Sequence, residues 1–464
     1  MFEIRVVNNA SVPLSLKFEK SDYISNQMIL NNLIATLVKY DNSGNLVPFL
    51  SQGWTIENNG LLWKFIIKPN YRDQAGVLIS SQRFAEDLLE TFKFLRNRNE
   101  SFWGESLVGW QDYKSFKEDH VSGLSWDDES ILFNFESQPD QFLNFLRMPY
   151  FGYWGSNRMS DEQSFVSSGP YKLHSANPSL IILELRDCYQ KEKNQLNFVM
   201  FSQGEVSDCD FREKQFMAIS KSMDAMAYPS DLKKIAMPPD GLSVVVLNRT
   251  SIEKFLDAHS YKIFVNDLRN DLLKVRKSDE DFRTTSFYGL NIEDVGHHSE
   301  VDLSKFKPKR PLKILVSSTW EKEIVNSAES LVISILERNS WAFKIYSLED
   351  MDKHQMEFSD FDIRFVSVIA GQKFNSAVVE MMFCSKLGVN FPDPGGRVEK
   401  ILSEVDWSDE NKETALNELL FEEGSLIPYL RFGLVWTFAE KVNFEKDPGP
   451  APYLALHLLR VKDS

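Results

Sequence analysis

Residues 47–68 read VPFLSQGWTIENNGLLWKFIIK, and this stretch predicts two strands joined by a tight turn. Trp54–Glu57 and Leu61–Lys68 are rich in aromatic and β-branched residues, which favour extended structure. Asn58-Asn-Gly60 lies between them, and Asn-Gly supplies the positive φ angles that two-residue hairpin turns need. We therefore expect a β-hairpin here.

Segments on both sides of this hairpin have apolar residues at helical spacing. Residues 84–95 repeat apolar side chains three and four positions apart, which predicts an amphipathic helix. Its polar face, expected toward water, consists of Arg83, Glu86, Asp87 and Glu90. Residues 29–40 show similar spacing, so a second helix is expected there. A third is expected around Ala415–Leu420, with Gly424 as its C-terminal cap.

The clearest supersecondary unit lies in the second half of the chain. Leu312–Val316 and Ala342–Tyr346 have the pattern of strands, and the apolar positions from Ile324 to Leu336 form one helix face. This order predicts a βαβ unit with parallel strands. Because single cores stop growing near about 250 to 300 residues, a chain of 464 residues is expected to form two lobes.

Composition restricts the classes of partner. A formal net charge of -15 argues against binding nucleic acid through a general basic field, since phosphate binding needs clustered Lys and Arg. No uninterrupted apolar run is long enough for a transmembrane helix. Met1 is followed by the strand-like segment Phe2–Val7 without a signal-like apolar region, so either a signal was removed or the protein is cytoplasmic.

Cysteine and histidine patterns give weak signals. The three cysteines lack metal-type spacing, and a Cys188–Cys209 disulfide would form only in an oxidising compartment. His297 and His298 are adjacent in a polar loop without further ligands nearby, which favours a solvated loop over a metal site. The nucleophile elbow, the zinc-protease motif, the phosphate loop and the dinucleotide fingerprint do not occur. We therefore expect no catalysis, no cofactor and no metal.

Several short segments occur in the order found in one transporter-associated family. They are Asn32–Asp41, Val47–Leu50 with Gly53-Trp54, the Asn59-Gly60 hairpin, Ala85–Asp87, Ser168-Gly-Pro-Tyr-Lys172, Val244–Asn248, and Glu422-Glu423 with Leu426–Tyr429. In this order and spacing the chain resembles family 5 solute-binding proteins, the dipeptide- and oligopeptide-binding class of ABC importers. The likeness touches most of the chain.

The resemblance implies an α/β fold of the two-lobed periplasmic-binding-protein type, known as a Venus flytrap, with mixed sheets, flanking helices and a hinge. Lobe I would comprise residues 1–246 and 428–464, with a subdomain near 46–167, and lobe II residues 247–427. A ligand held between hinged lobes favours the closed state only when it contacts both halves.

The function implied is that of a monomeric receptor outside the cytoplasm that delivers a small-molecule or peptide-like ligand to a membrane permease. A ligand-sensing or degenerate domain in the cytoplasm, without a permease, is the alternative. In the resemblance, Asn248 and the loop at Gly371-Gln372 would face the ligand. Asn248 could equally satisfy a turn at a strand end.

Four aromatic residues are further candidates for ligand contact, because aromatic rings offer large contact areas. They are Tyr150, Phe151, Tyr153 and Trp154. Packing in the core is the competing interpretation for all four.

One departure from the family concerns the ligand. Peptide-binding members are expected to hold the ligand's ammonium group with an acidic residue, but Ser367–Gln372 and Ile34–Thr36 contain none. Losing one partner of a buried charge pair costs about 2 to 5 kcal/mol. The sequence therefore argues against a simple peptide ligand.

Overall fold

The computed structural model describes residues 2–6, 14–18, 24–41, 45–97, 106–139, 142–155, 157, 165–189, 195–203, 207–213, 216–221, 229–236, 241–272, 302–316, 328–356, 360–369, 412–432, 434–440, 442 and 456–459. Contacts between Cα atoms divide the chain into two compact units. The first unit contains the described residues up to Ala236 and from Leu434 onward, and the second contains those between them. Both ends of the chain thus lie in the first unit.

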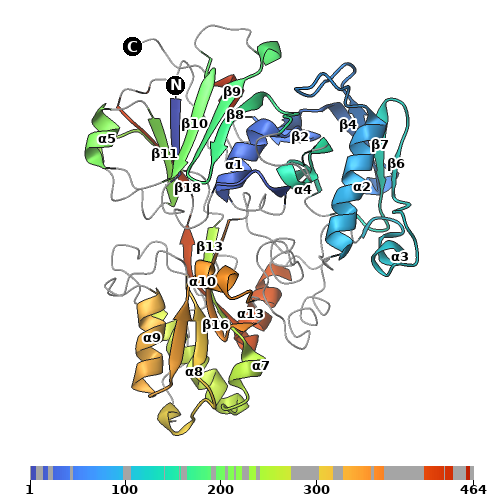
Figure 1. Ribbon diagram of the computed structural model, residues 1–464. Helices are drawn as coiled ribbons and strands as arrows, with labels where there is room; N and C mark the ends of the chain where they lie inside the picture. The colour runs from blue at the N-terminus through green and yellow to red at the C-terminus, as the bar shows by residue number, and fades with distance from the viewer. Residues whose placement is uncertain are drawn as a thin grey trace. The chain divides into compact units, whose positions relative to one another are not determined.

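A mixed sheet of seven strands organises the first unit, in the order β12-β18-β11-β1-β10-β9-β8 (Figure 1). Its strands are β1 (Phe2–Val6), β8 (Tyr171–Asn177), β9 (Leu180–Leu185), β10 (Phe198–Gln203), β11 (Phe216–Lys221), β12 (Lys234–Ala236) and β18 (Leu434–Phe438). β1 is parallel to both of its neighbours, whereas β18 runs antiparallel to β11. The chain therefore returns to the sheet in which it began.

A second layer of the first unit contains the hairpin. A four-stranded antiparallel sheet has the order β4-β5-β7-β6, and helix α2 lies beside β6 and β7 (Figure 1). The elements are β4 (Ser51–Glu57), η2 (Asn58–Gly60), β5 (Leu62–Ile67), α2 (Ser81–Asn97), α3 (Trp110–Lys114), β6 (Leu124–Trp126) and β7 (Ser130–Asn134). The apolar face of α2 is fully buried at Phe84, Leu88, Phe92 and Leu95.

Shorter elements complete the first unit. They are α1 (Ile24–Leu33), β2 (Val38–Tyr40), β3 (Leu46–Pro48), α4 (Phe142–Leu146), η4 (Pro149–Phe151), η7 (Asp187–Tyr189), α5 (Asp208–Glu213) and η11 (Leu456–Leu458). Phe142 of α4 packs against the four-stranded sheet, with its ring centroid 5.0 Å from that of Phe133 and 6.1 Å from that of Phe65.

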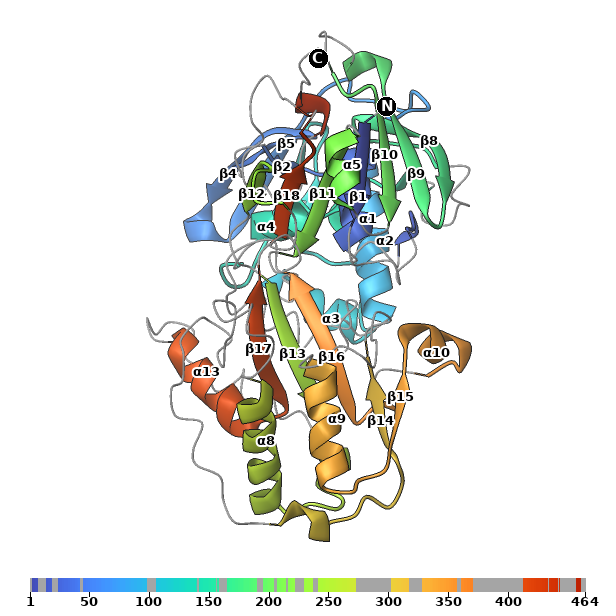
Figure 2. The same cartoon turned by 90° about the vertical axis from the view of Figure 1, so that its left-hand side faces the viewer.

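The second unit is built on a five-stranded sheet in the order β15-β14-β16-β13-β17. Helices α8 and α9 lie side by side against it (Figure 2). The elements are β13 (Gly241–Leu247), α7 (Arg249–Ile252), α8 (Ala258–Leu272), η9 (Leu303–Lys305), β14 (Leu312–Leu315), α9 (Ala328–Arg338), β15 (Phe343–Tyr346), α10 (Leu348–Lys353), β16 (Ile363–Ile369), α13 (Lys412–Glu423) and β17 (Leu426–Phe432). β14 and β15 are parallel, which confirms the predicted βαβ unit.

Strand β13 explains why the compact units differ from the expected lobe boundaries. β13 pairs antiparallel over residues 241–247 with β16 and from Gly241 to Val246 with β17. A boundary at residues 246/247 would cut this strand, whereas the contacts place the division at Met237/Pro238 and at Gly433/Leu434. Backbone pairing therefore keeps the whole of β13 in the second unit.

The helix expected over residues 29–40 is wrong in its extent. Helix α1 ends at Leu33, and Val38–Tyr40 forms strand β2 against β3. The helix ends because the backbone after Leu33 forms hydrogen bonds with residues distant in the sequence. The Ala35 N–H donates to the Ser168 hydroxyl at 2.8 Å, and the Tyr153 N–H donates to the Ala35 carbonyl at 2.8 Å.

The hairpin is confirmed, but its turn is wider than two residues. Asn58, Asn59 and Gly60 form a three-residue turn with positive φ angles of 51°, 54° and 91°. The left-handed region suits Asn and Gly, which explains the composition of the turn. Within the described ranges, no helix is both long and apolar enough to span a membrane.

Candidate functional site

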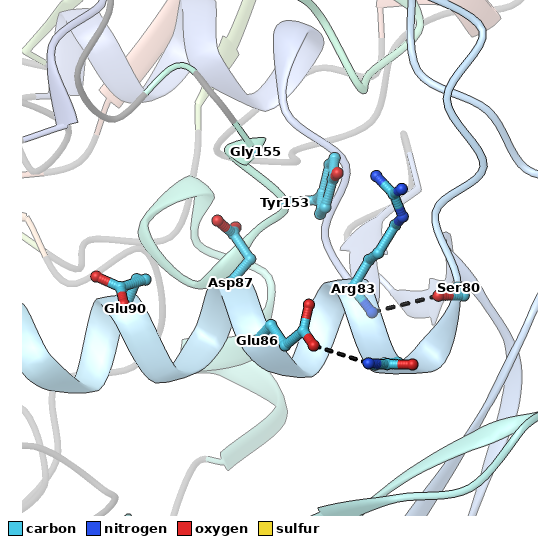
Figure 3. Close-up of a pocket in the computed structure, with 8 residues that line it drawn as sticks. Ser80, Arg83, Glu86, Asp87, Glu90, Tyr153 and Gly155 are labelled. Atoms are coloured by element: carbon cyan, nitrogen blue, oxygen red, sulfur yellow. Dashed lines mark hydrogen bonds between the residues drawn. The ribbon is translucent and has the colours of Figure 1, made fainter. Parts of the chain in front are cut away.

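A surface hollow of about 600 Å³ opens beside the first turns of α2 (Figure 3). Its lining comes from α2 and from the loop that follows η4, and consists of Ser80, Gln82, Arg83, Glu86, Asp87, Glu90, Tyr153 and Gly155. Arg83 and Asp87 extend from α2 toward the loop that carries Tyr153 and Gly155 (Figure 3). We call this feature the α2 hollow.

Most polar groups of the α2 hollow already have partners in the protein. The Gln82 amide donates to Glu86 at 2.9 Å, and Lys93 lies 3.8 Å from Glu90. Burial raises the pKa of Tyr153, and a hydrogen bond from Arg83 partly opposes this effect. The hollow is thus acidic and polar, but its carboxylates already interact with groups of the protein.

Asp87 corrects the expectation that the whole polar face of α2 is turned toward water. Asp87 is 8% exposed, and its carboxylate accepts a hydrogen bond from the backbone N–H of Trp154 at 2.7 Å. A charge-assisted hydrogen bond of this kind offsets part of the cost of burying the carboxylate. Asp87 therefore fixes the segment after η4 onto α2.

The predicted aromatic residues lie mainly in the core. Phe18 stacks on Tyr150 with ring centroids 4.6 Å apart and meets Trp154 edge-on at 5.1 Å. Phe151 is 1% exposed. The Trp154 indole N–H donates to the Pro149 carbonyl at 2.8 Å. Tyr153 is the one member of the four that lines the α2 hollow, so packing accounts for the positions of the other three.

Asn248 follows the last residue of β13 and serves as the N-terminal cap of α7. Its side-chain oxygen accepts the Ser251 N–H at 3.1 Å, and its own N–H donates to the Asp362 carbonyl at 2.8 Å. The chain enters the second unit before Gly241, so Asn248 lies at the opposite end of β13 from that entry. Contact of Asn248 with a ligand stays a prediction.

Replacing Asn248 by alanine should lower the free energy of unfolding by about 1 kcal/mol, because α7 loses its cap. Asn248→Ser should retain most of the stability, since the serine hydroxyl can accept the same N–H. Urea denaturation followed by circular dichroism measures both effects. Equal stability of Asn248→Ala and the unchanged protein would show that the cap contributes nothing.

Other sequence candidates lie outside the described residues, namely Gly371, Gln372, His297 and His298. Cys188 is an exposed free thiol. Within the described part of the chain, no three or more His, Cys, Asp or Glu side chains are grouped so that they could hold a metal ion.

The sheets and helices have the arrangement of the two-lobed α/β periplasmic binding proteins. OppA of Haemophilus influenzae in complex with RPPGFSPFR superposes with a TM-score of 0.74 at 14% identity, over 99% of both chains. NikA of Staphylococcus aureus in complex with Ni(L-His)2 superposes with a TM-score of 0.70 at 13% identity, over 100% of both chains. These likenesses establish the fold.

Sequence comparison points in the same direction. The oligopeptide-binding protein AmiA of Streptococcus pneumoniae is 24% identical over 249 residues, which are 48% of this chain and 37% of AmiA. The aligned part therefore spans little more than a third of that relative. No family model matches the chain. The chain is thus similar in sequence to proteins named oligopeptide-binding proteins, and in fold to OppA and NikA.

Proposed function

We propose that this protein is the solute-binding component of an ABC-type importer and captures a small ligand without chemical conversion. The observation that carries the proposal is the likeness of fold over essentially the whole chain to proteins solved with a bound peptide or nickel complex. The relatives found by sequence are named oligopeptide-binding proteins, which supports transport over a role as a cytoplasmic sensor.

The proposal includes a location and a partner. One structural neighbour, DppA of Helicobacter pylori, is an ABC transporter-associated periplasmic binding protein. By analogy, the chain would act outside the cytoplasm as a monomer and deliver its ligand to a membrane permease. The formal charge of -15 is compatible with a receptor that does not bind nucleic acid.

The ligand class follows from what the neighbours hold. A peptide and a nickel–histidine complex are both built from amino acids, and both carry carboxylate groups. We propose that the ligand is a peptide or a metal complex of amino acids, and that it differs from a simple peptide held through one acidic anchor.

Calorimetry and thermal unfolding with a small panel test this function. The panel consists of RPPGFSPFR, STSA and Ni(II) with L-histidine, the ligands of the solved neighbours. One class should raise the midpoint of thermal unfolding, because a ligand at a hundred times its Kd stabilises the native state by about 2.7 kcal/mol. Failure of every class to release heat or to stabilise the protein would contradict the proposal.

The α2 hollow provides a matched control variant. Its three carboxylates already have partners, because Glu86 accepts from Gln82, Glu90 lies near Lys93 and Asp87 accepts a backbone N–H. We therefore do not place the ligand there. Glu86→Gln combined with Glu90→Gln should leave the affinity for the ligand unchanged. A loss of affinity in this double variant would move the binding site to the hollow.

A further inference from the structure

The ring of Phe49 is surrounded by basic side chains in the first unit. The Lys39 ammonium lies 4.1 Å and the Lys68 ammonium 5.9 Å from the ring centroid, and the His457 ring lies 6.4 Å from it. Among the described residues, neither lysine forms an ion pair with a carboxylate. Three groups that can carry positive charge therefore share one partly buried site.

The contact between Lys39 and His457 joins β2 to the C-terminal turn η11. Lys39 Nζ lies 2.9 Å from His457 Nε2. At this distance one nitrogen must accept the hydrogen bond, so the pair can hold no more than one of its two titratable protons. A charged lysine with a neutral histidine satisfies the contact, and so does a neutral pair. A doubly protonated pair cannot.

The surroundings make a second proton still less favourable. Burial lowers the pKa of Lys39 to about 7, and the nearby charge of Lys68 acts in the same direction. Burial also lowers the pKa of Lys68. Among the described residues, the other titratable or charged groups around the site include Tyr71 beside Phe49 and Tyr189 beside His457, with Arg186 and Cys188 next to these tyrosines.

Gln195 and Tyr189 also contact η11. The Gln195 amide donates to the His457 carbonyl at 3.3 Å, and the His457 ring meets Tyr189 at 5.6 Å. Leu456 is buried. The nitrogen–nitrogen contact is thus a direct polar link between this turn and β2.

We propose that Lys39 and His457 form a one-proton latch that holds η11 on the first unit at neutral pH and opens when acid protonates both nitrogens. Opening takes up a proton, so the open state gains population as the pH falls and loses it as the pH rises. In the limiting range the ratio of open to closed forms should change about tenfold per pH unit.

Hydrogen–deuterium exchange of a peptide covering residues 456–459 tests the latch, with rates corrected for intrinsic chemistry. Between about pH 8 and about pH 5, which brackets the ordinary pKa of histidine, protection of η11 should fall while protection of α2 stays constant. Lys117, which is exposed and paired with Asp112, offers a control: Lys117→Met should leave the profile unchanged.

Two variants separate the latch from simple packing. In His457→Gln the amide oxygen can still accept from Lys39 but cannot be protonated, so the contact should persist and its pH dependence should disappear. In Lys39→Met the contact is lost, and η11 should exchange faster at every pH without the additional acid effect. Equal protection at both ends of the pH range, or an unchanged profile in His457→Gln, would overturn the proposal. If His457→Gln does not fold, the unchanged protein and Lys39→Met decide the outcome.

Discussion

Asp362→Ala should lower the free energy of unfolding of the second unit by about 3 kcal/mol. Asp362 is 1% exposed. Its carboxylate accepts hydrogen bonds from both terminal guanidinium nitrogens of Arg310, at 2.7 Å and 2.8 Å. It also accepts the Lys313 backbone N–H at 2.7 Å and the Ser251 hydroxyl. Removing one partner of a buried ion pair costs about 3 to 5 kcal/mol. The lower end applies because the Arg310 side chain is 50% exposed and can be hydrated.

Urea denaturation measures this loss, and hydrogen exchange locates it in β13, β14 and β16. Asp362→Asn keeps one acceptor oxygen, so its loss should be smaller than that of alanine. Asp112→Ala removes one partner of an exposed ion pair and should cost less than about 1 kcal/mol. Equal costs for Asp112→Ala and Asp362→Ala would show that the buried carboxylate does not organise this sheet.

Trp154→Ala should destabilise the first unit by about 3 to 5 kcal/mol. The indole is 1% exposed, packs edge-on against Phe18 and Phe165, and donates its N–H to the Pro149 carbonyl. Truncating a buried aromatic side chain loses its burial and leaves a cavity, and the cost is of this size. A purely ligand-contacting aromatic residue would instead cost little stability and much affinity.

The measurement combines thermal unfolding with calorimetry of the best ligand from the panel. Phe116→Ala serves as the exposed aromatic control, because Phe116 is 67% exposed. It loses only a surface contact with the Arg96 guanidinium, so it should change stability by less than about 1 kcal/mol. If Trp154→Ala unfolds like the unchanged protein but binds ligand weakly, the assignment of Trp154 to the core is wrong.

Local patterns in the sequence were sufficient for the hairpin, α2 and the βαβ unit. Each of these elements depends on periodic apolar side chains or on turn residues close in the sequence. The end of α1 could not be predicted in this way, because Ser168 terminates the helix by a hydrogen bond to Ala35, 133 positions away. Tertiary contacts of that kind override helical spacing.

The candidate site was harder to predict than the fold, for the same reason. Its position on the polar face of α2 predicted Asp87 to be a surface residue. In the structure, its carboxylate accepts the backbone N–H of Trp154 from the loop after η4, and the sequence does not show this contact. The contact of Lys39 with His457 spans 418 positions, so no local pattern in the sequence could predict it. By contrast, the capping role of Asn248 was one of two local interpretations and agrees with a short-range hydrogen bond.

Native mass spectrometry of freshly purified protein tests the central claim most directly, namely that this chain captures a small solute. The account predicts a population heavier than the bare chain by the mass of one peptide or one metal–amino-acid complex. That added mass should disappear after unfolding, dialysis and refolding, and should return when the matching ligand is supplied. A bare chain in every fresh preparation, together with no binding across the panel, would contradict the assignment.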